Sequence, residues 1–223
     1  MTQQIRRIAV WSKWQRIAHW LLATSTLVLM GTGWLIANTP SVAESASGVH
    51  LYAASILIFA LALRLALGFF GKGAERFVHL LPVESEWPGI RASLMFYLSF
   101  GKAPLPNWYA HNPLWKPLYL LLLLLLILAV ASGWLMPDRP LLAGIYLPAM
   151  HGRLADLILI TIVAHVYCVI LQDWKGQAAD SSAMLTGYRY FVVDRSAQQT
   201  VDVSPITINL NDIGGPGSEK RRD

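Results

Sequence analysis

The sequence is poor in cysteine and in charged residues. Its only cysteine is Cys168, which excludes an intramolecular disulfide and any cysteine-rich zinc or iron–sulfur site. The Cys-x-x-Cys-His motif is also absent, so no haem is expected to be attached covalently. Charged residues make up 14% of the chain, against about 25% in an ordinary soluble protein. Together with 55% hydrophobic residues, this shortage of charge predicts a membrane protein.

The net charge of +5 does not indicate a protein that binds nucleic acid. The Lys and Arg residues form no single basic stripe and instead gather at the ends of apolar segments. The positive-inside rule describes this distribution. Membrane lipids, and not nucleic acid, are therefore the expected surroundings of the chain.

Four apolar segments are long enough to cross a bilayer, which takes about 20 residues of helix. We predict spans at about residues 17–36, 49–70, 113–136 and 150–171. Their continuous apolar runs lack the alternating pattern of a membrane β-barrel. The predicted fold is an all-α membrane protein. It has a four-transmembrane-helix bundle within residues 1–193 and a flexible polar tail over residues 194–223.

The Lys and Arg residues also predict the orientation. They are concentrated in the first sixteen residues, in the segment 71–112 and in the tail, whereas the short loops 38–48 and 137–149 contain few. This bias places both termini and the long middle segment in the cytoplasm of a bacterial inner-membrane protein. Within that middle segment, residues 88–100 fit a short interfacial helix or an ordered loop equally well.

Four of the six histidines lie in or at the ends of the predicted spans, namely His19, His50, His151 and His165. An ionisable side chain at membrane depth normally faces a partner or a cofactor. For one such histidine alone, an interior hydrogen bond would explain its position equally well. Helix rise places His165 about 21 Å deeper than His151. Depth therefore sorts the four into an inner pair, His19 with His165, and an outer pair, His50 with His151.

Two flat cofactors stacked across the membrane would suit this arrangement. Two imidazoles from different helices, on opposite faces of a porphyrin, form a bis-histidine haem that favours electron transfer. We therefore predict two non-covalent b-type haems, one for each pair. A zinc site would need three or four ligands at one point, and the His-x-x-x-His spacing of membrane di-iron enzymes is absent. A haem-free channel, transporter or anchor whose histidines relay protons is a further hypothesis.

Arg64 follows His50 by fourteen residues, on the same predicted helix face and at the depth of the inner pair. A lone Arg in a span needs an anion, for which a haem propionate or a carboxylate of a quinone site is the natural candidate. The alternative is that Arg64 snorkels toward the inner interface.

Five stretches of the sequence resemble the prokaryotic di-haem cytochrome b561 family, and within it the b-type cytochrome subunit of membrane-bound Ni/Fe-hydrogenases. The resemblance covers roughly residues 10–190. The matching stretches are Arg16-Ile-Ala-His-Trp20, His50 through Arg64, Ala110-His-Asn-Pro-Leu114, His151-Gly-Arg-Leu154 through His165-Val-Tyr167, and Met184-Leu-Thr-Gly-Tyr-Arg189. The outward loop 137–149 is shorter than in those hydrogenase cytochromes.

The resemblance implies electron transfer between a quinone near the inner haem and a periplasmic redox partner, either a hydrogenase-type enzyme or a cytochrome c. It also implies that Asn112 lies at the quinone site, because related formate dehydrogenase cytochromes have an Asn there before the third span. Next to it, His111 is the candidate proton donor or acceptor, since its unperturbed pKa is near neutrality. Asn112 could instead only cap the third span. The alternative function is a stand-alone cytochrome b561 that oxidises quinol with an external acceptor such as superoxide.

Overall fold

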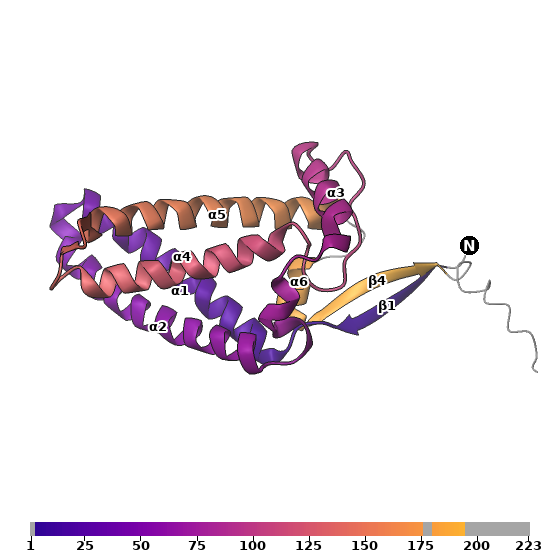
Figure 1. Ribbon diagram of the computed structural model, residues 1–223, viewed down its shortest axis with the longest axis horizontal. Helices are drawn as coiled ribbons and strands as arrows, with labels where there is room; N and C mark the ends of the chain where they lie inside the picture. Colours follow the sequence, from indigo (N-terminus) through magenta and orange to yellow (C-terminus); the bar gives the residue numbers. More distant parts are fainter. Residues whose placement is uncertain (1–2, 176–179, 195–223) are drawn as a thin grey trace, which may run out of the picture. The chain divides into compact units, whose positions relative to one another are not determined.

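The computed structural model describes residues 3–175 and 180–194, and it contains four long helices (Figure 1). These are α1 (Lys13–Asn38), α2 (Ala43–Phe70), α4 (Trp115–Leu135) and α5 (Leu147–Lys175). Each is long and apolar enough to cross a membrane, so the predicted four-helix membrane fold is confirmed. Three of the helices run several residues beyond the predicted spans, because polar residues continue a helix outside the hydrocarbon layer.

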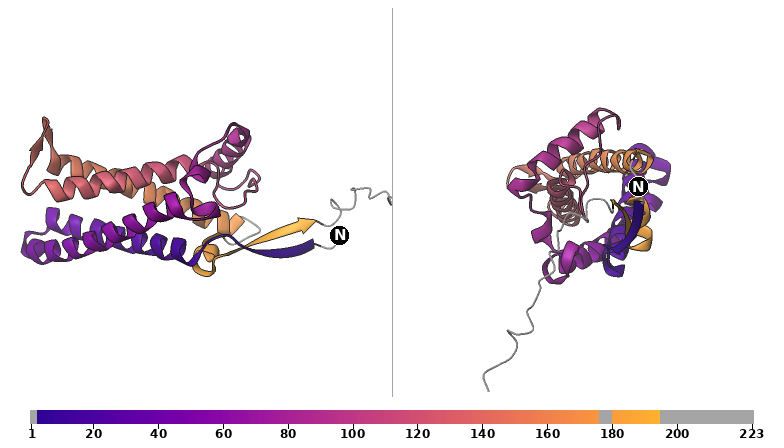
Figure 2. Two further views of the ribbon diagram at one scale, coloured as in Figure 1. Left: turned by 60° about the horizontal axis from the view of Figure 1, so that its bottom comes forward. Right: turned by 90° about the vertical axis from the view of Figure 1, so that its right-hand side faces the viewer.

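The long helices form two antiparallel hairpins, which Figure 2 separates in its left view. One consists of α1 packed along α2, and the other of α4 packed along α5, while α2 and α4 make the main contact between the hairpins. A buried core joins them near the middle of the bundle. It consists of Leu57, Leu61, Leu125, Leu126, Leu154 and Ile158.

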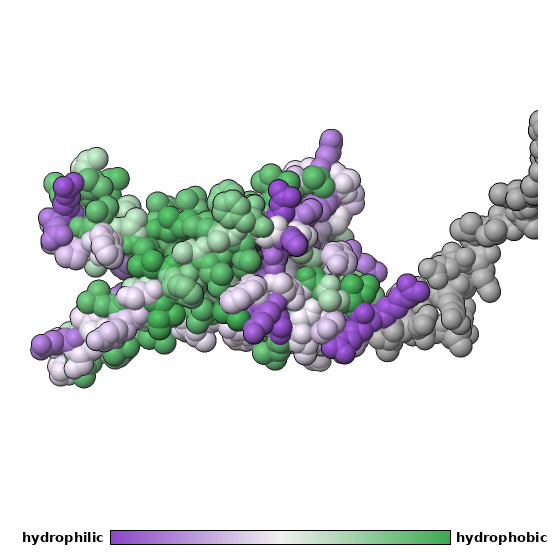
Figure 3. Space-filling model, turned by 90° about the horizontal axis from the view of Figure 1, so that it is seen from below, coloured by the Kyte–Doolittle hydropathy of each residue, from purple (hydrophilic) through white to green (hydrophobic). Residues whose placement is uncertain are grey.

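The outer surface of the bundle is hydrophobic over the middle of the helices and more hydrophilic toward both ends (Figure 3). Large apolar side chains such as Phe59, Leu128 and Ile160 are exposed there. Soluble proteins rarely expose continuous apolar patches of this extent. The surface therefore fits a multi-pass membrane protein whose apolar band is covered by lipid.

Shorter elements lie at the two ends of the bundle. Helices α3 (Trp87–Leu98) and α6 (Asp180–Thr186) lie at one end, and α3 realises the helical alternative for residues 88–100. At the other end, β2 (Leu141–Leu142) pairs antiparallel with β3 (Ile145–Tyr146). Ala143 and Gly144, both with positive φ, form the two-residue turn between these strands. The sequence did not predict this hairpin.

The remaining elements are four 3₁₀ turns and a strand pair that the sequence also did not predict. The turns span Pro40–Val42, Gly73–Glu75, Phe77–Leu80 and Glu84–Glu86. Strand β1 (Gln3–Ala9) pairs with β4 (Tyr188–Asp194). The chain divides into a compact unit Arg6–Phe191, which contains the bundle, and a second unit of the two chain ends. The tail predicted to be flexible lies outside the described residues beyond position 194.

Candidate functional site

The structure brings the four membrane histidines together as two facing pairs. The ring centroids of His19 in α1 and His165 in α5 are 6.4 Å apart, with an interplanar angle of 63°. Those of His50 in α2 and His151 in α5 are also 6.4 Å apart, at 67°. These are the inner and outer pairs that helix depth predicted. Each pair takes one histidine from each of the two hairpins.

The distance between paired rings fits one metal ion held between two imidazoles. A metal–imidazole bond of about 2.0–2.1 Å and a further ~1.1 Å from nitrogen to ring centre put two opposed centroids about 6.3 Å apart. The observed 6.4 Å in both pairs matches this value. The spacing of each pair therefore leaves room for one metal ion between the two rings.

Two buried hydroxyls hold the rings of the outer pair. Thr32 Oγ1 in α1 lies 2.9 Å from Nδ1 of His50, and Ser132 Oγ in α4 lies 3.0 Å from Nδ1 of His151. The sequence analysis missed both residues. A recurring pattern could have revealed them, because Thr32-Gly-Trp in α1 and Ser132-Gly-Trp in α4 stand at similar distances before the histidines.

Aromatic rings surround the inner pair. The ring of His165 lies 5.4 Å from that of Trp115 and 6.1 Å from that of Tyr119, measured between centroids. The ring of His19 lies 5.5 Å from that of Trp20. Trp115 opens α4 and is buried, so the start of α4 fixes one side of the inner pair.

A cavity of about 480 Å³, here called the inner cavity, brings the inner pair together with the predicted polar residues. Its lining includes His19, His165, Arg64, His111, Asn112 and Gln15. Cavities of this size are typical of sites for small molecules and cofactors. The sequence analysis missed Gln15, which is 7% exposed and whose Oε1 atom has no hydrogen-bond partner among the residues that the structure describes. A buried polar atom without a partner is costly, so Gln15 is suited to receive a donor from a bound molecule.

Arg64 is buried at the edge of the inner cavity. It is 8% exposed, its Nη1 donates a hydrogen bond of 3.1 Å to the carbonyl oxygen of Glu75, and its guanidinium lies 4.9 Å from the ring centre of Phe77. This burial argues against the alternative that Arg64 snorkels to the interface. A guanidinium carries five N–H donors, so Arg64 can hold an anion in the cavity as well as the Glu75 carbonyl.

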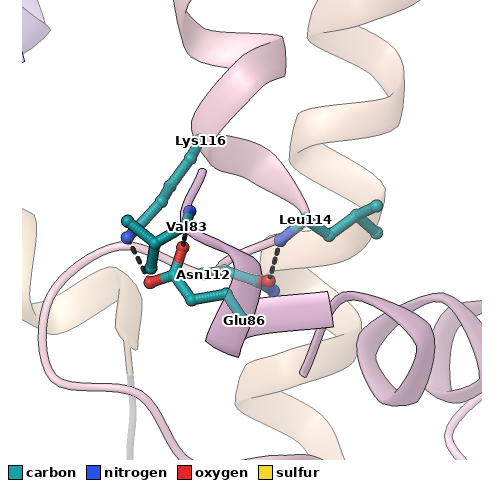
Figure 4. A network of polar contacts seen from close by, with 5 residues as sticks. All are labelled: Val83, Glu86, Asn112, Leu114 and Lys116. Atoms are coloured by element: carbon teal, nitrogen blue, oxygen red, sulfur yellow. Dashed lines mark hydrogen bonds and ion pairs between the residues drawn. The ribbon is translucent and has the colours of Figure 1, made fainter. Parts of the chain in front are cut away.

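Asn112 both shapes the start of α4 and joins a polar network. Its Oδ1 accepts a hydrogen bond of 3.0 Å from the backbone nitrogen of Leu114 (Figure 4). Its Nδ2 donates to Tyr97 Oη at 2.6 Å, and Gln172 Nε2 donates to the same hydroxyl. Burial raises the pKa of the Tyr97 phenol above its usual range, which keeps this hydroxyl protonated. The turn-forming role of Asn112 is therefore present, and it leaves one amide N–H beyond the Tyr97 contact.

A second polar contact steadies the same region. Figure 4 shows the carboxylate of Glu86 paired with Lys116, the second residue of α4. The other oxygen of Glu86 accepts a hydrogen bond of 3.4 Å from the backbone nitrogen of Val83. The segment before α3 is thereby tied to the first turn of α4.

His111 is packed against aromatic rings at the wall of the cavity. Its ring centroid lies 4.9 Å from that of Trp11 and 5.9 Å from that of Tyr119. Burial lowers the pKa of His111 to about 3, and the positive charges of Arg64 and Lys116 act in the same direction. The ring is therefore neutral near pH 7, where it can exchange hydrogen bonds but does not store a proton.

Residues 184–189, the C-terminal stretch that resembles hydrogenase cytochromes, form one wall of the inner cavity through Met184 and Arg189. Trp20 Nε1 donates to the carbonyl oxygen of Met184 at 3.1 Å, and Arg189 Nη1 donates to that of Trp108 at 2.8 Å. Gly187 has φ +89°, and a β-carbon there would lie 2.8 Å from the backbone oxygen of Trp11. Glycine is thus the residue that lets the segment fold back onto the start of α1.

Comparisons with known proteins give one family and several related cytochromes. The model of the family described as prokaryotic cytochrome b561 matches residues 10–187. The chain is 25% identical to the probable Ni/Fe-hydrogenase 1 B-type cytochrome subunit of Escherichia coli K12, over 78% of this chain and 87% of that protein. The probable Ni/Fe-hydrogenase B-type cytochrome subunit of Cupriavidus necator is 22% identical, over 79% of this chain and 84% of that protein. The corresponding protein of Azotobacter vinelandii is 25% identical, over 81% of this chain and 87% of that protein. No solved structure matches the chain.

Proposed function

Because the chain belongs to the prokaryotic cytochrome b561 family, and is thus a membrane electron-transfer cytochrome with haem b, we propose that it links a periplasmic redox partner to the quinone pool. Several relatives are named as subunits of Ni/Fe-hydrogenases. A hydrogenase-type enzyme is therefore the first candidate for the partner, and a cytochrome c is the second.

The protein binds two b haems in this proposal, one between each pair of histidines. The observation that carries it is the 6.4 Å distance between ring centroids in both pairs. His19 and His165 hold the inner haem, and His50 and His151 hold the outer one. A haem held there would supply one-electron redox chemistry, and its two histidine ligands would leave no open position for oxygen chemistry. Two haems at different depths give the electron a path across the bilayer.

Arg64 binds a propionate of the inner haem in this proposal. Its guanidinium is buried at the cavity edge and donates to the carbonyl oxygen of Glu75. A buried cation is costly unless anions face it. The carboxylate of Glu75 already acts on Arg64, and a haem propionate would supply a second anion on the cavity side.

Quinone binds in the inner cavity beside His19 and His165. The free N–H of the Asn112 amide donates to a quinone carbonyl without adding a charge in low dielectric. The unpartnered Oε1 of Gln15 accepts from the hydroxyl of the reduced quinol. His111, neutral near pH 7, orients the headgroup by hydrogen bonding.

Both termini face the cytoplasm in this proposal, and the inner cavity opens at the cytoplasmic end of the bundle. The distribution of Lys and Arg supports this orientation. Reporter fusions at Glu44 and Asp138 should behave as periplasmic, and fusions at Glu84 and Glu219 as cytoplasmic. The reverse pattern would invert the levels of the two haems.

Haem counting tests the core of the proposal. A pyridine haemochrome assay should give two b haems per wild-type chain. Replacing His50 or His151 with Ala should remove one haem, replacing His19 or His165 should remove the other, and His79→Ala, which changes an exposed histidine, should keep both. A wild-type protein with one haem or none would refute the two-haem assignment.

Purification from the native membrane tests the partner. A hydrogenase-type enzyme or a cytochrome c that co-purifies, and that reduces added quinone only when the cytochrome is present, is the expected result. A cytochrome that purifies alone and passes electrons from quinol to an external acceptor would instead identify the stand-alone cytochrome b561.

A further inference from the structure

The two helix hairpins build the same contact twice, once for each ring of the outer pair. In the first hairpin Thr32 lies 2.9 Å from Nδ1 of His50, which follows it by 18 residues. In the second, Ser132 lies 3.0 Å from Nδ1 of His151, which follows it by 19 residues. Thr32 and Ser132 are 8% and 1% exposed, respectively. Both hydroxyls are therefore interior groups at equivalent positions.

The direction of the hydrogen bond to His50 follows from the other contacts of Thr32. A hydroxyl has one proton to donate, and Thr32 Oγ1 donates it to the carbonyl oxygen of Val28 at 2.8 Å. With its proton on that carbonyl, the oxygen accepts from the ring of His50. In this arrangement Nδ1 of His50 is the protonated nitrogen, and Nε2 keeps its lone pair.

The direction at His151 is fixed by two acceptors. Ser132 Oγ donates its proton to the carbonyl oxygen of Ala129 at 3.0 Å, so it accepts from the ring. The same carbonyl oxygen lies 3.1 Å from Nδ1 of His151, and a carbonyl never donates. Nδ1 of His151 is therefore protonated as well, and Nε2 is left as the ligating atom.

We propose that Thr32 and Ser132 are positioning residues of the outer haem. They lock both ligands in the tautomer that presents Nε2, and they make both imidazoles more basic. The inference rests on the proposed function, in which His50 and His151 ligate that haem. Hydrogen bonds to the second nitrogen of a ligating histidine are known to fix its orientation and to raise its basicity.

The expected consequence is a lower midpoint potential for the outer haem. More basic ligands stabilise ferric iron over ferrous iron, so they make the haem harder to reduce. The inner pair is surrounded by rings such as Trp20 and Trp115 and touches neither hydroxyl. Removing the hydroxyl of Thr32 or of Ser132 should therefore change the midpoint potential of the outer haem and leave that of the inner haem unchanged.

The experiment is a spectroelectrochemical titration of the full-length protein, with electron paramagnetic resonance of the ferric haems. In Thr32→Val and Ser132→Ala, the ratio of reduced to oxidised outer haem at a fixed potential should rise three- to tenfold, a tenfold rise being 59 mV. The g values of the outer haem should change and those of the inner haem should not. Thr32→Ser should restore wild-type behaviour. Ser25→Ala is the matched control, because this buried hydroxyl of α1 bonds, within the described part of the chain, only to its own helix backbone at Leu21 and Leu22.

Unchanged outer-haem potentials in Thr32→Val and Ser132→Ala would overturn the inference, as would an equal shift of both haems or the same shift in Ser25→Ala. If Thr32→Val loses the outer haem altogether, retention in Thr32→Ser supports the role of the hydroxyl, and loss there too refutes it. A wild-type protein without an outer haem would refute the proposed function separately. In that case the inference is tested by the tautomer of His50, which the ¹⁵N resonances of labelled histidine report. Nδ1 protonation at His50 in the wild type, lost in Thr32→Val, would support it, and the same tautomer in both would refute it.

Discussion

Gly133 lies directly against the ring of His151. A β-carbon at this position would stand 3.1 Å from Cε1 of His151, whereas a β-carbon on Gly33, the equivalent residue of the first hairpin, would stand 3.6 Å from Cε1 of His50. The second distance is an ordinary van der Waals contact, and the first is too short for one. An alanine at position 133 would therefore require the ring of His151 to move, whereas an alanine at position 33 would leave the ring of His50 in place.

This difference predicts unequal effects of one methyl group at the two positions. Gly133→Ala should push the ring of His151 away, lower the content of the outer haem and alter its electron paramagnetic resonance, because overpacking typically costs about 1–3 kcal/mol. Gly33→Ala should bind both haems normally and melt at an equal or higher temperature, since Ala favours a helix over Gly by up to about 1 kcal/mol. Equal spectra in the two variants would contradict the packing argument.

The membrane fold and the pairing of the histidines were predictable because each depends on a simple rule. The length of apolar sequence needed to cross a bilayer defines the spans, and the helix rise defines the depth of His151 and His165. Both properties survive changes in the details of packing. Depth places His19 and His165 at one level of the bundle, and the rotation of each helix then brings their rings to 6.4 Å from each other.

The residues that hold the rings were not predictable by the same rules. Thr32 and Ser132 bond to their own helix backbone, as hydroxyls in membrane helices commonly do, so a hydroxyl within a span carries no signal by itself, and only the repeated Thr/Ser-Gly-Trp pattern before the histidines marks these two. Gln15 and Tyr97 become site residues only when distant segments fold over the inner cavity. Strand β1 was missed because its partner, β4, lies at the other end of the sequence.

The charge of Arg64 should raise the potential of the inner haem. A reduced haem carries one more negative charge, which a buried cation at ~10 Å stabilises by about 1–2 kcal/mol at an effective dielectric constant near 20. Arg64→Gln should therefore lower the inner-haem potential by ~40–80 mV and leave the outer haem unchanged. The control is Arg76→Gln, which removes an exposed charge that does not line the inner cavity. A redox titration in which both variants behave alike would contradict a specific role for Arg64.

His111 should make the folded protein sensitive to acid. Its pKa is lowered to about 3 by burial, whereas the unfolded chain takes up the proton near pH 6.5. The unfolded state therefore binds more protons between these values, so the stability that His111 contributes is present above pH 6.5 and is lost as the pH falls toward 3. The melting temperature of His111→Gln in detergent should fall less steeply than that of the wild type from pH 6.5 to 4. Parallel curves for the two proteins would show that the ring is not buried as described.

Asn112 should be needed for the reaction with quinone beyond its role at the start of α4. The two roles use different atoms, because Oδ1 accepts from the backbone of Leu114 while Nδ2 carries the donors. Asn112→Ser keeps an acceptor of the kind that begins helices and loses the amide donor. In this variant both haems and the melting temperature should stay close to wild type, while quinone-dependent turnover should fall at least tenfold, as expected for the loss of a buried hydrogen bond of more than about 1.4 kcal/mol.

Asn112→Ala and Tyr97→Phe complete the comparison. The Ala variant loses the acceptor as well, so it should also melt earlier, by the equivalent of about 1 kcal/mol. Tyr97→Phe keeps Asn112 but removes the hydroxyl that receives its Nδ2 and that of Gln172. The amide is then less firmly oriented, and we expect the KM for quinone to rise more than kcat falls. Normal turnover in Asn112→Ser, combined with a lower melting temperature in Asn112→Ala, would show that Asn112 only shapes the turn. In that case, because Gln15 lies on the same cavity with an unpartnered Oε1, the quinone headgroup would have to be bound from the α1 side.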